Sequence, residues 1–208
     1  MSAYKLLAAS VGVAAMTLLA FMYWYQWSAR TLTPSEIDDY MTTIEAQSQV
    51  PGARHDLPAL RKFLKDDDGK PVNTVNLYKF HKAADYPEDS GFTGTGEEAY
   101  DRFSSVMISL MTKRGSHPIY ASSWADEANS EWDRIVIVRY RSRRDLVDLF
   151  ATDAFAEASL HKWASLRDHD RMLVQAVHIP DGRYIAMLIA LVLGVAVYAF
   201  GRILLNRS

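Results

Sequence analysis

The chain has 208 residues, a formal net charge of −2 and no cysteine, which excludes disulfides, thiolate metal sites and cysteine nucleophiles. All 25 acidic residues lie between Arg30 and Arg183, and this region has a net charge of about −7. It lacks the concentrated positive charge that the nucleic-acid backbone requires, so the sequence predicts no nucleic-acid partner.

The first predicted element is an apolar helix from Leu6 to Trp27 that contains no charged residue. A helix rises ~1.5 Å per residue and needs roughly 20 apolar residues to cross a ~30 Å hydrocarbon core. The stretch ends in aromatic residues, which favour the membrane interface. The sequence therefore predicts a transmembrane anchor over residues 1–30. A cleavable signal peptide is the alternative, because Lys5 precedes the stretch and Ser28-Ala29 follow it.

A second apolar stretch, from Tyr184 to Gly201, predicts another anchor over residues 182–208. With two spans, both termini lie on the same side of the membrane. The tails carry basic residues and no acid, so the positive-inside rule places the termini in the cytoplasm. The sequence thus predicts a protein of the inner or plasma membrane that contacts the lipid bilayer and carries an extracytoplasmic domain.

Residues 31–70 are predicted to form a helical spacer. Two short helices, Ser35 to Gln47 and Asp56 to Leu64, are separated by Pro51-Gly52. An acidic turn, Asp66 to Gly69, closes the second helix and separates the spacer from the domain that follows.

Residues 71–181 are predicted to form one domain with the element order β-α-β-β-α-β. The elements are a strand Val72 to Phe80, a helix capped by Thr95 and Glu98 and stopped by Gly115, strands Pro118 to Trp124 and Trp132 to Tyr140, a helical region Arg143 to Arg167 broken near Thr152-Asp153, and a strand Arg171 to Ile179. This order predicts an α+β, ferredoxin-like domain, with both helices on one face of an antiparallel sheet.

The third predicted strand is apolar on both sides. Ile135 and Ile137 point one way, and Val136 and Val138 point the other way, so both faces of the sheet are expected to be buried. The helices cover one face. A second copy of the chain stacked on the other face would complete the burial, which predicts a homodimer.

A short basic cluster lies at the end of the same strand: Arg139, Arg141, Arg143 and Arg144. We interpret it as a solvated strand end that leads into a helix. An anion or lipid-headgroup site is the alternative.

Four segments together resemble a known family: Val75 to Phe80, the Gly-rich loop before Glu98-Ala99-Tyr100, Glu131 to Tyr140, and His161 with Leu166 and Asp168. They resemble an uncharacterised family, domain of unknown function thirteen-thirty, of the dimeric α/β-barrel superfamily, over about Pro71 to Ile179. The resemblance implies a homodimeric ferredoxin-like barrel near families of small-molecule monooxygenases and haem-handling proteins, and it implies no reaction. Two membrane spans depart from the mostly soluble pattern of that family.

The sequence assigns no catalytic residue and leaves open whether the protein is an enzyme, because it contains no nucleotide-binding, zinc-protease or serine-hydrolase motif. The candidate ligand-binding residues are His161, Ser165 and Asp168, which would share one helix face, together with Tyr100, Lys79 and His81. His161 could act as a base, as an axial haem ligand or as a hydrogen-bonded surface group. No metal or cofactor is predicted, and haem is the alternative kept open.

Two functional hypotheses follow. The first is an accessory or assembly subunit whose anchors pack against integral membrane partners. It is based on small residues in the two apolar stretches, which allow close packing of membrane helices: Gly12, Ala14, Ala15, Ala186, Ala190, Gly194 and Ala196. The second is a membrane-tethered small-molecule-binding protein or cofactor-poor oxidoreductase of the dimeric α/β-barrel type, in which His161 and Tyr100 orient the ligand. The sequence favours the first hypothesis slightly.

Overall fold

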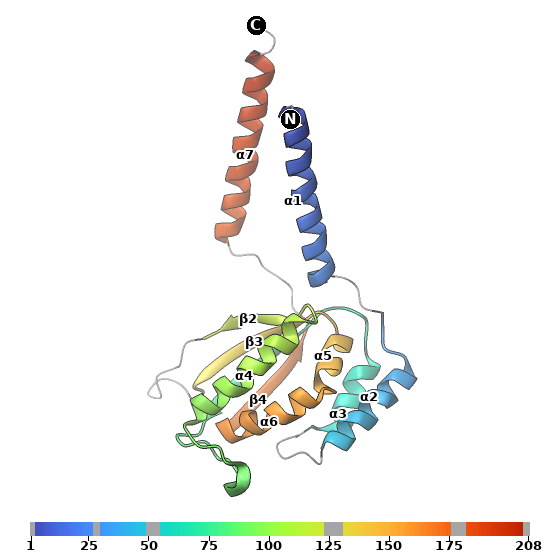
Figure 1. Ribbon diagram of the computed structural model, residues 1–208, viewed down its shortest axis with the longest axis vertical. Coiled ribbons are helices and arrows are strands. Elements are labelled where there is room, and N and C mark those ends of the chain that lie inside the picture. The colour runs from blue at the N-terminus through green and yellow to red at the C-terminus, as the bar shows by residue number, and fades with distance from the viewer. Residues whose placement is uncertain (1–2, 27–29, 49–54, 123–130, 176–181, 206–208) are drawn as a thin grey trace. The chain divides into compact units, whose positions relative to one another are not determined.

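A computed structural model describes residues 3–26, 30–48, 55–122, 131–175 and 182–205, and these residues form an α+β structure (Figure 1). The α-helices are α1 Ala3–Gln26, α2 Pro34–Gln47, α3 Leu57–Lys65, α4 Gly96–Thr112, α5 Arg143–Phe150, α6 Asp153–Ser165 and α7 Gly182–Leu205. The strands are β1 Val72–Phe80, β2 His117–Ala121, β3 Arg134–Tyr140 and β4 Leu166–Val174. Residues 1–175 and 176–208 are separate units, so α7 is described by itself.

The four strands form one antiparallel sheet in the order β2-β3-β1-β4. Helices α4 and α6 pack against each other across one face of this sheet (Figure 1). Because side chains alternate along a strand, Thr74, Asn76 and Tyr78 of β1 face these helices, whereas Val75 and Leu77 face away. The predicted α+β class, with its helices on one face of the sheet, is confirmed.

Helix α4 supplies much of the core. Its N-terminus carries the predicted capping box, in which Thr95 accepts a hydrogen bond from the Glu98 backbone and Glu98 accepts one from the Thr95 backbone. Tyr100, Phe103 and Met107 follow at helical spacing and are buried. Burial of each such side chain contributes roughly 1.5–3 kcal/mol. These contacts fix the helix on the sheet.

The last strand differs from the prediction. It begins at Leu166 instead of Arg171 and ends at Val174, and residues 176–179 lie outside the described residues. His169 and Asp170, which precede the predicted start of the strand, pair with Tyr78 and Leu77 of β1. An edge strand pairs through its backbone and needs few apolar residues, so the polar run from Arg167 to Arg171 concealed it.

The other boundaries lie closer to the prediction. The helical region does break at Thr152, which caps α6. Strand β2 runs from His117 to Ala121, and the predicted continuation to Trp124 falls partly outside the described residues. Strand β3 begins at Arg134, two residues after the predicted start.

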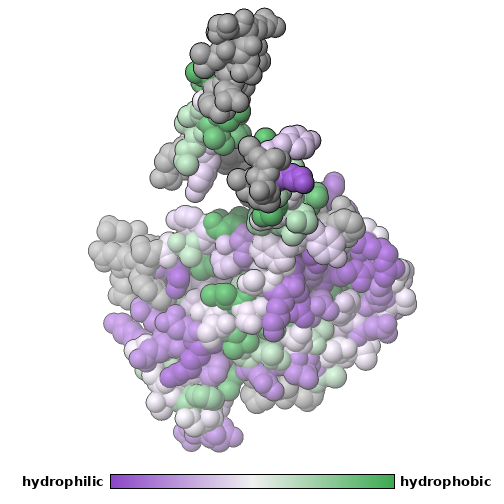
Figure 2. Space-filling view, turned by 45° about the horizontal axis from the view of Figure 1, so that its top comes forward, coloured by the Kyte–Doolittle hydropathy of each residue, from purple (hydrophilic) through white to green (hydrophobic). Residues whose placement is uncertain are grey.

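In the described part of the chain one helix is long and apolar enough to cross a membrane, with its span at Leu7–Tyr25 in α1. A signal sequence, the alternative noted above, meets the same criteria. The predicted second span is not confirmed, because the apolar stretch Tyr184–Val197 of α7 is shorter than the required length. The face of the folded domain seen in Figure 2 is mostly hydrophilic, with hydrophobic residues in separate patches.

The basic cluster after β3 is held by contacts within the protein. Arg141 forms an ion pair with Asp145 at 2.6 Å, and Arg144 forms one with Glu36 at 2.9 Å. The Arg143 guanidinium lies 4.8 Å from the centroid of the Phe63 ring. Arg141 and Arg144 therefore have carboxylate partners, whereas buried guanidinium nitrogens of Arg139 and Arg143 have no hydrogen-bond partner among the described residues. The ion pair with Glu36 and the contact with Phe63 connect the start of α5 to α2 and α3.

Candidate functional site

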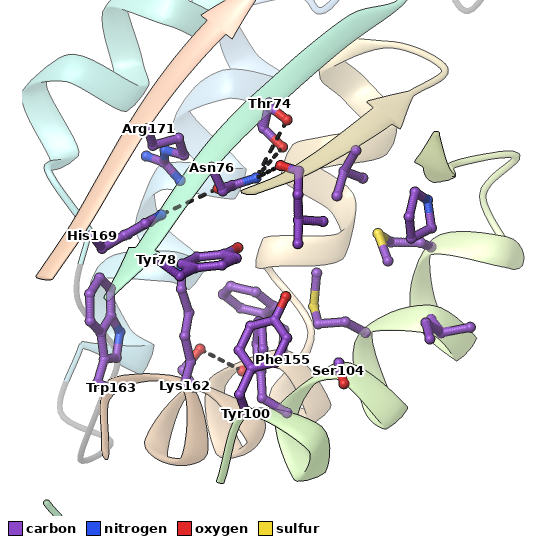
Figure 3. A pocket seen from close by; sticks show the side chains of 18 of the residues that line it. Thr74, Asn76, Tyr78, Tyr100, Ser104, Phe155, Lys162, Trp163, His169 and Arg171 are labelled. Atoms are coloured by element: carbon purple, nitrogen blue, oxygen red, sulfur yellow. Dashed lines mark hydrogen bonds between the residues drawn. The ribbon is translucent and has the colours of Figure 1, made fainter. Parts of the chain in front are cut away.

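A cavity of about 530 Å³ lies between the sheet and helices α4 and α6 (Figure 3). Ligand pockets in proteins typically measure 300–1,000 Å³. Its polar lining includes Thr74, Asn76 and Tyr78 of β1, Tyr100 and Ser104 of α4, Arg134 of β3, Ser159 and Lys162 of α6, and His169 and Arg171 of β4. Its apolar lining includes Phe103, Met107, Met111, Pro118, Val136, Val138, Phe155 and Trp163.

Asn76 is a buried amide on the central strand β1. Its Nδ2 donates hydrogen bonds to the Val136 carbonyl at 3.2 Å and to Thr74 Oγ1 at 3.1 Å. Because a carbonyl can only accept, these bonds orient the amide and place Oδ1 toward His169 Nε2, 3.3 Å away. Asn76 therefore holds His169 with its proton on Nε2 and its lone pair on Nδ1.

His169 is an uncharged imidazole in this setting. Burial, with Lys162 and Arg171 nearby, lowers the pKa of His169 to about 3. Its ring stacks on Tyr78, with 5.1 Å between the centroids, and meets the edge of Trp163 at 5.8 Å. The cavity wall thus includes a neutral histidine of fixed tautomer.

Two tyrosines form another part of this wall. The rings of Tyr78 and Tyr100 lie 5.1 Å apart. Burial raises the pKa of Tyr78 well above 10 and also raises the pKa of Tyr100. Both phenols remain protonated at neutral pH, so they can donate hydrogen bonds to a bound group.

Lys162 is the only lysine that lines the cavity within the described residues, and it is 9% exposed. Its Nζ lies 4.7 Å from the centroid of the Trp163 ring and 5.8 Å from that of Phe103. In the described part of the chain no carboxylate lies within ion-pair distance of it. Burial, and secondarily Arg171, lowers the pKa of Lys162 to about 7.

Among the predicted site residues, Tyr100 lines the cavity. His161 does not: its Nδ1 lies 2.8 Å from the Tyr86 hydroxyl, and its ring meets the edge of Phe92 at 4.7 Å. Burial and Arg102 lower the pKa of His161. His161 therefore anchors the segment after β1 to α6, away from the cavity.

The predicted helix face shared by His161, Ser165 and Asp168 is wrong. Helix α6 ends at Ser165, and Asp168 lies on β4 opposite Lys79. The Ser165 side chain is fully buried and donates to the Lys162 carbonyl at 2.6 Å. Asp168 pairs with Arg167 at the surface.

Lys79 and His81 do not line the cavity either. Lys79 forms an ion pair with Asp133 at 2.7 Å on the sheet face away from the helices. The His81 backbone N–H donates to the Ser165 carbonyl at 2.9 Å, and its carbonyl accepts from Gly96 at 3.1 Å. A Cβ at Gly96 would lie 2.3 Å from the His81 carbonyl oxygen, so the helix begins with glycine at this junction.

The residues that give the cavity its charge were not among the predicted site residues. Helical spacing from Phe155 through Ser159 to Lys162 places the lysine on the buried face of α6, and this signal was present in the sequence. His169 and Arg171 alternate along β4, but the misplaced start of that strand concealed them.

No family model matches the chain, and no curated protein matches it. Two crystal structures resemble its fold. One is of the methylated RPA0582 protein, with 19% identity over 64% of this chain and 100% of that chain and a TM-score of 0.55. The other is of the RPA0582 protein of unknown function from Rhodopseudomonas palustris, with 19% identity over 61% and 97% of the two chains and a TM-score of 0.53. At this identity the likeness shows the fold alone.

Proposed function

We propose that this protein is a membrane-tethered domain that binds a small molecule in the cavity between the sheet and helices α4 and α6. The observation that carries the proposal is a cavity of about 530 Å³ that combines aromatic walls with a buried lysine. A few polar groups on a mostly apolar wall are typical of ligand sites, since they orient a molecule that the apolar surface desolvates. Tyr100 keeps its predicted orienting role, and Lys162 takes the place of His161.

The accessory-subunit hypothesis concerns the membrane segments and not this cavity. It stays a prediction, as do the second span, the cytoplasmic termini and the extracytoplasmic domain. The apolar helix α1, with its span at Leu7–Tyr25, supports the tether. The cavity favours the small-molecule hypothesis, because a subunit that only packs against other proteins would not require a buried cation beside an open space.

We further propose that the domain is ferredoxin-like and that it dimerises. The element order and the strand order β2-β3-β1-β4 support the first point. The sheet face away from the helices supports the second: Val75, Leu77, Ile135 and Ile137 lie there half-buried, and Met172 is 51% exposed. A second copy stacked on this face would remove the apolar side chains from water.

Filling the cavity at its mouth tests the binding function. Ser104 lines the cavity, whereas the neighbouring Ser105 is exposed on another side of α4, and both hydroxyls bond a carbonyl of the preceding turn. In full-length protein extracted in mild detergent, Ser104→Trp is expected to weaken binding of an apolar aromatic probe, 4-phenylbutan-1-ol, by at least about tenfold, because the indole occupies its volume. Equilibrium dialysis measures the affinity.

Ser105→Trp is the matched control, and it should bind the probe like the wild type. Equal affinity in both variants would show that the probe binds elsewhere. Absence of binding to the wild type would contradict the proposed function.

A further inference from the structure

The cavity concentrates positive charge at one place. Lys162, Arg134 and Arg171 all line it, from α6, β3 and β4. Two acids also line the cavity. Asp56 caps α3, where it accepts a hydrogen bond from the Ala59 backbone at 3.0 Å, and Asp101 is exposed on α4. A buried ammonium without a carboxylate partner is costly, since its hydration is lost and no opposite charge replaces it.

We propose that the ligand is a carboxylate with an apolar, aromatic body and that its carboxylate binds Lys162. This inference rests on the proposed function and names the ligand class of the same cavity. The incoming anion supplies the missing opposite charge, and charge-assisted hydrogen bonds of this kind are about twice as strong as neutral ones. The phenols of Tyr78 and Tyr100 can donate further hydrogen bonds to oxygen atoms of the ligand (Figure 3).

The body of the ligand follows from the remaining walls. The rings of Trp163 and Phe103 lie beside the lysine ammonium, at 4.7 and 5.8 Å. Phe155, Met107 and Val138 continue the apolar lining along α6, α4 and β3. Aromatic walls favour offset or edge-to-face contact with a planar ring. A flexible alkyl chain would fill the same space but would lose more conformational entropy when bound.

Protonation of Lys162 couples binding to pH. Because the pKa of Lys162 is lowered to about 7, much of the lysine is neutral above that pH in the empty cavity. A carboxylate prefers the ammonium, so binding takes up a proton and weakens as the pH rises above 7. The charged or titratable groups that share the cavity lining are Tyr78 of β1, Tyr100 and Asp101 of α4, Arg134 and Tyr140 of β3, His169 and Arg171 of β4, and His55 and Asp56 before α3.

The two histidines and three tyrosines of the lining do not change charge between pH 7 and 9. The pKa values of His55 and His169 are lowered to about 4 and about 3, and those of the three tyrosines are raised, that of Tyr140 to about 12. The carboxylate-specific loss of binding in this range therefore reports Lys162.

The test compares three probes that share one body: 4-phenylbutyrate, 4-phenylbutan-1-ol and 4-phenylbutylamine. Full-length wild-type protein in detergent should bind the carboxylate at least about tenfold more tightly than the alcohol and should bind the amine least. From pH 7 to 9 the carboxylate affinity should fall by about tenfold per pH unit, while that of the alcohol stays constant. A parallel measurement with dodecanoate compares an alkyl carboxylate with the aromatic one. Tighter binding of dodecanoate than of 4-phenylbutyrate would contradict the inference that the ligand has an aromatic body.

Lys162→Met should abolish the preference, so that the carboxylate binds no more tightly than the alcohol. Lys82→Met, at an exposed lysine, is the control and should behave as wild type. Equal affinity of the wild type for carboxylate and alcohol would overturn the inference. A preference for the carboxylate that persists in Lys162→Met would overturn it too. Neither result would contradict the proposed binding function. Failure of all three probes to bind would overturn both. The probe comparison on wild-type protein requires no variant to fold.

Discussion

Lys162→Met is expected to make the ligand-free protein more stable at pH 6.5, by about 1–4 kcal/mol in the free energy of unfolding. The lysine is 9% exposed and has no carboxylate partner among the described residues, so the wild type carries the cost of an unpaired buried charge. Methionine keeps the length of the side chain and removes the charge. Chemical unfolding of the full-length protein in detergent measures the difference.

The same lysine gives the stability a defined pH dependence. Its ordinary pKa of 10.5 applies to the unfolded chain, and burial lowers it to about 7 in the folded one. Between these values the unfolded chain binds more protons, so the stability of the wild type rises with pH from 7 to about 10. The advantage of Lys162→Met should therefore shrink to less than about 1 kcal/mol at pH 10.

Lys82→Met provides the comparison at an exposed site and should change the stability by less than about 0.5 kcal/mol at either pH. Parallel stability curves for wild type and Lys162→Met from pH 6.5 to 10 would show that the lysine is charged and well solvated in the fold. Residues that serve binding at functional sites commonly lower the stability of the folded protein.

Aspartate substitutions at two neighbouring residues of β3 should affect folding and dimerisation differently. Val138 is 7% exposed and faces the helices, so Val138→Asp buries a charge without a partner and should cost several kcal/mol, enough to prevent folding. Ile137 lies on the opposite face, paired with Val75, and is half-buried. Ile137→Asp should leave the protein folded and convert the proposed dimer to a monomer. Native mass spectrometry and thermal unfolding of the full-length variants measure both effects.

A wild-type protein that is monomeric at micromolar concentration would contradict the proposed dimer. A folded Val138→Asp variant would contradict the assignment of that face to the core. The two substitutions differ by one position in the strand, so each serves as the control for the other.

Elements with strong local signals could be predicted from the sequence. The capping residues Thr95 and Glu98 and the apolar spacing from Tyr100 to Met111 defined α4, and the alternation in Val72 to Phe80 defined β1 with its bounds. Strand β4 could not be predicted, because an edge strand is held by backbone pairing to β1 and its side chains from Arg167 to Arg171 are polar.

The candidate site residues divide in the same way into those that local sequence signals could predict and those that they could not. Tyr100 was found because it lies on a well-predicted helix beside the sheet. His161 was chosen on an assumed helix that extended to Asp168, whereas α6 ends at Ser165 and turns directly into β4. Lys162, one residue further along, faces the cavity instead. A shift of one residue on a helix turns a side chain by about 100°, so the candidate site depends on tertiary packing that the local pattern of charged residues does not reveal.

Hydrogen exchange of the full-length protein, with and without 4-phenylbutyrate, tests most directly that the ligand occupies this cavity. The bound molecule should slow exchange of backbone amides in α6, Asp153–Ser165, in β4, Leu166–Val174, and in the middle of α4, because it contacts all three elements and stabilises them against local opening. Helix α2, Pro34–Gln47, contributes no residue to the cavity lining and should remain unchanged. Protection confined to α2, or no protection in α6 and β4 at saturating ligand, would contradict binding of the ligand in this cavity.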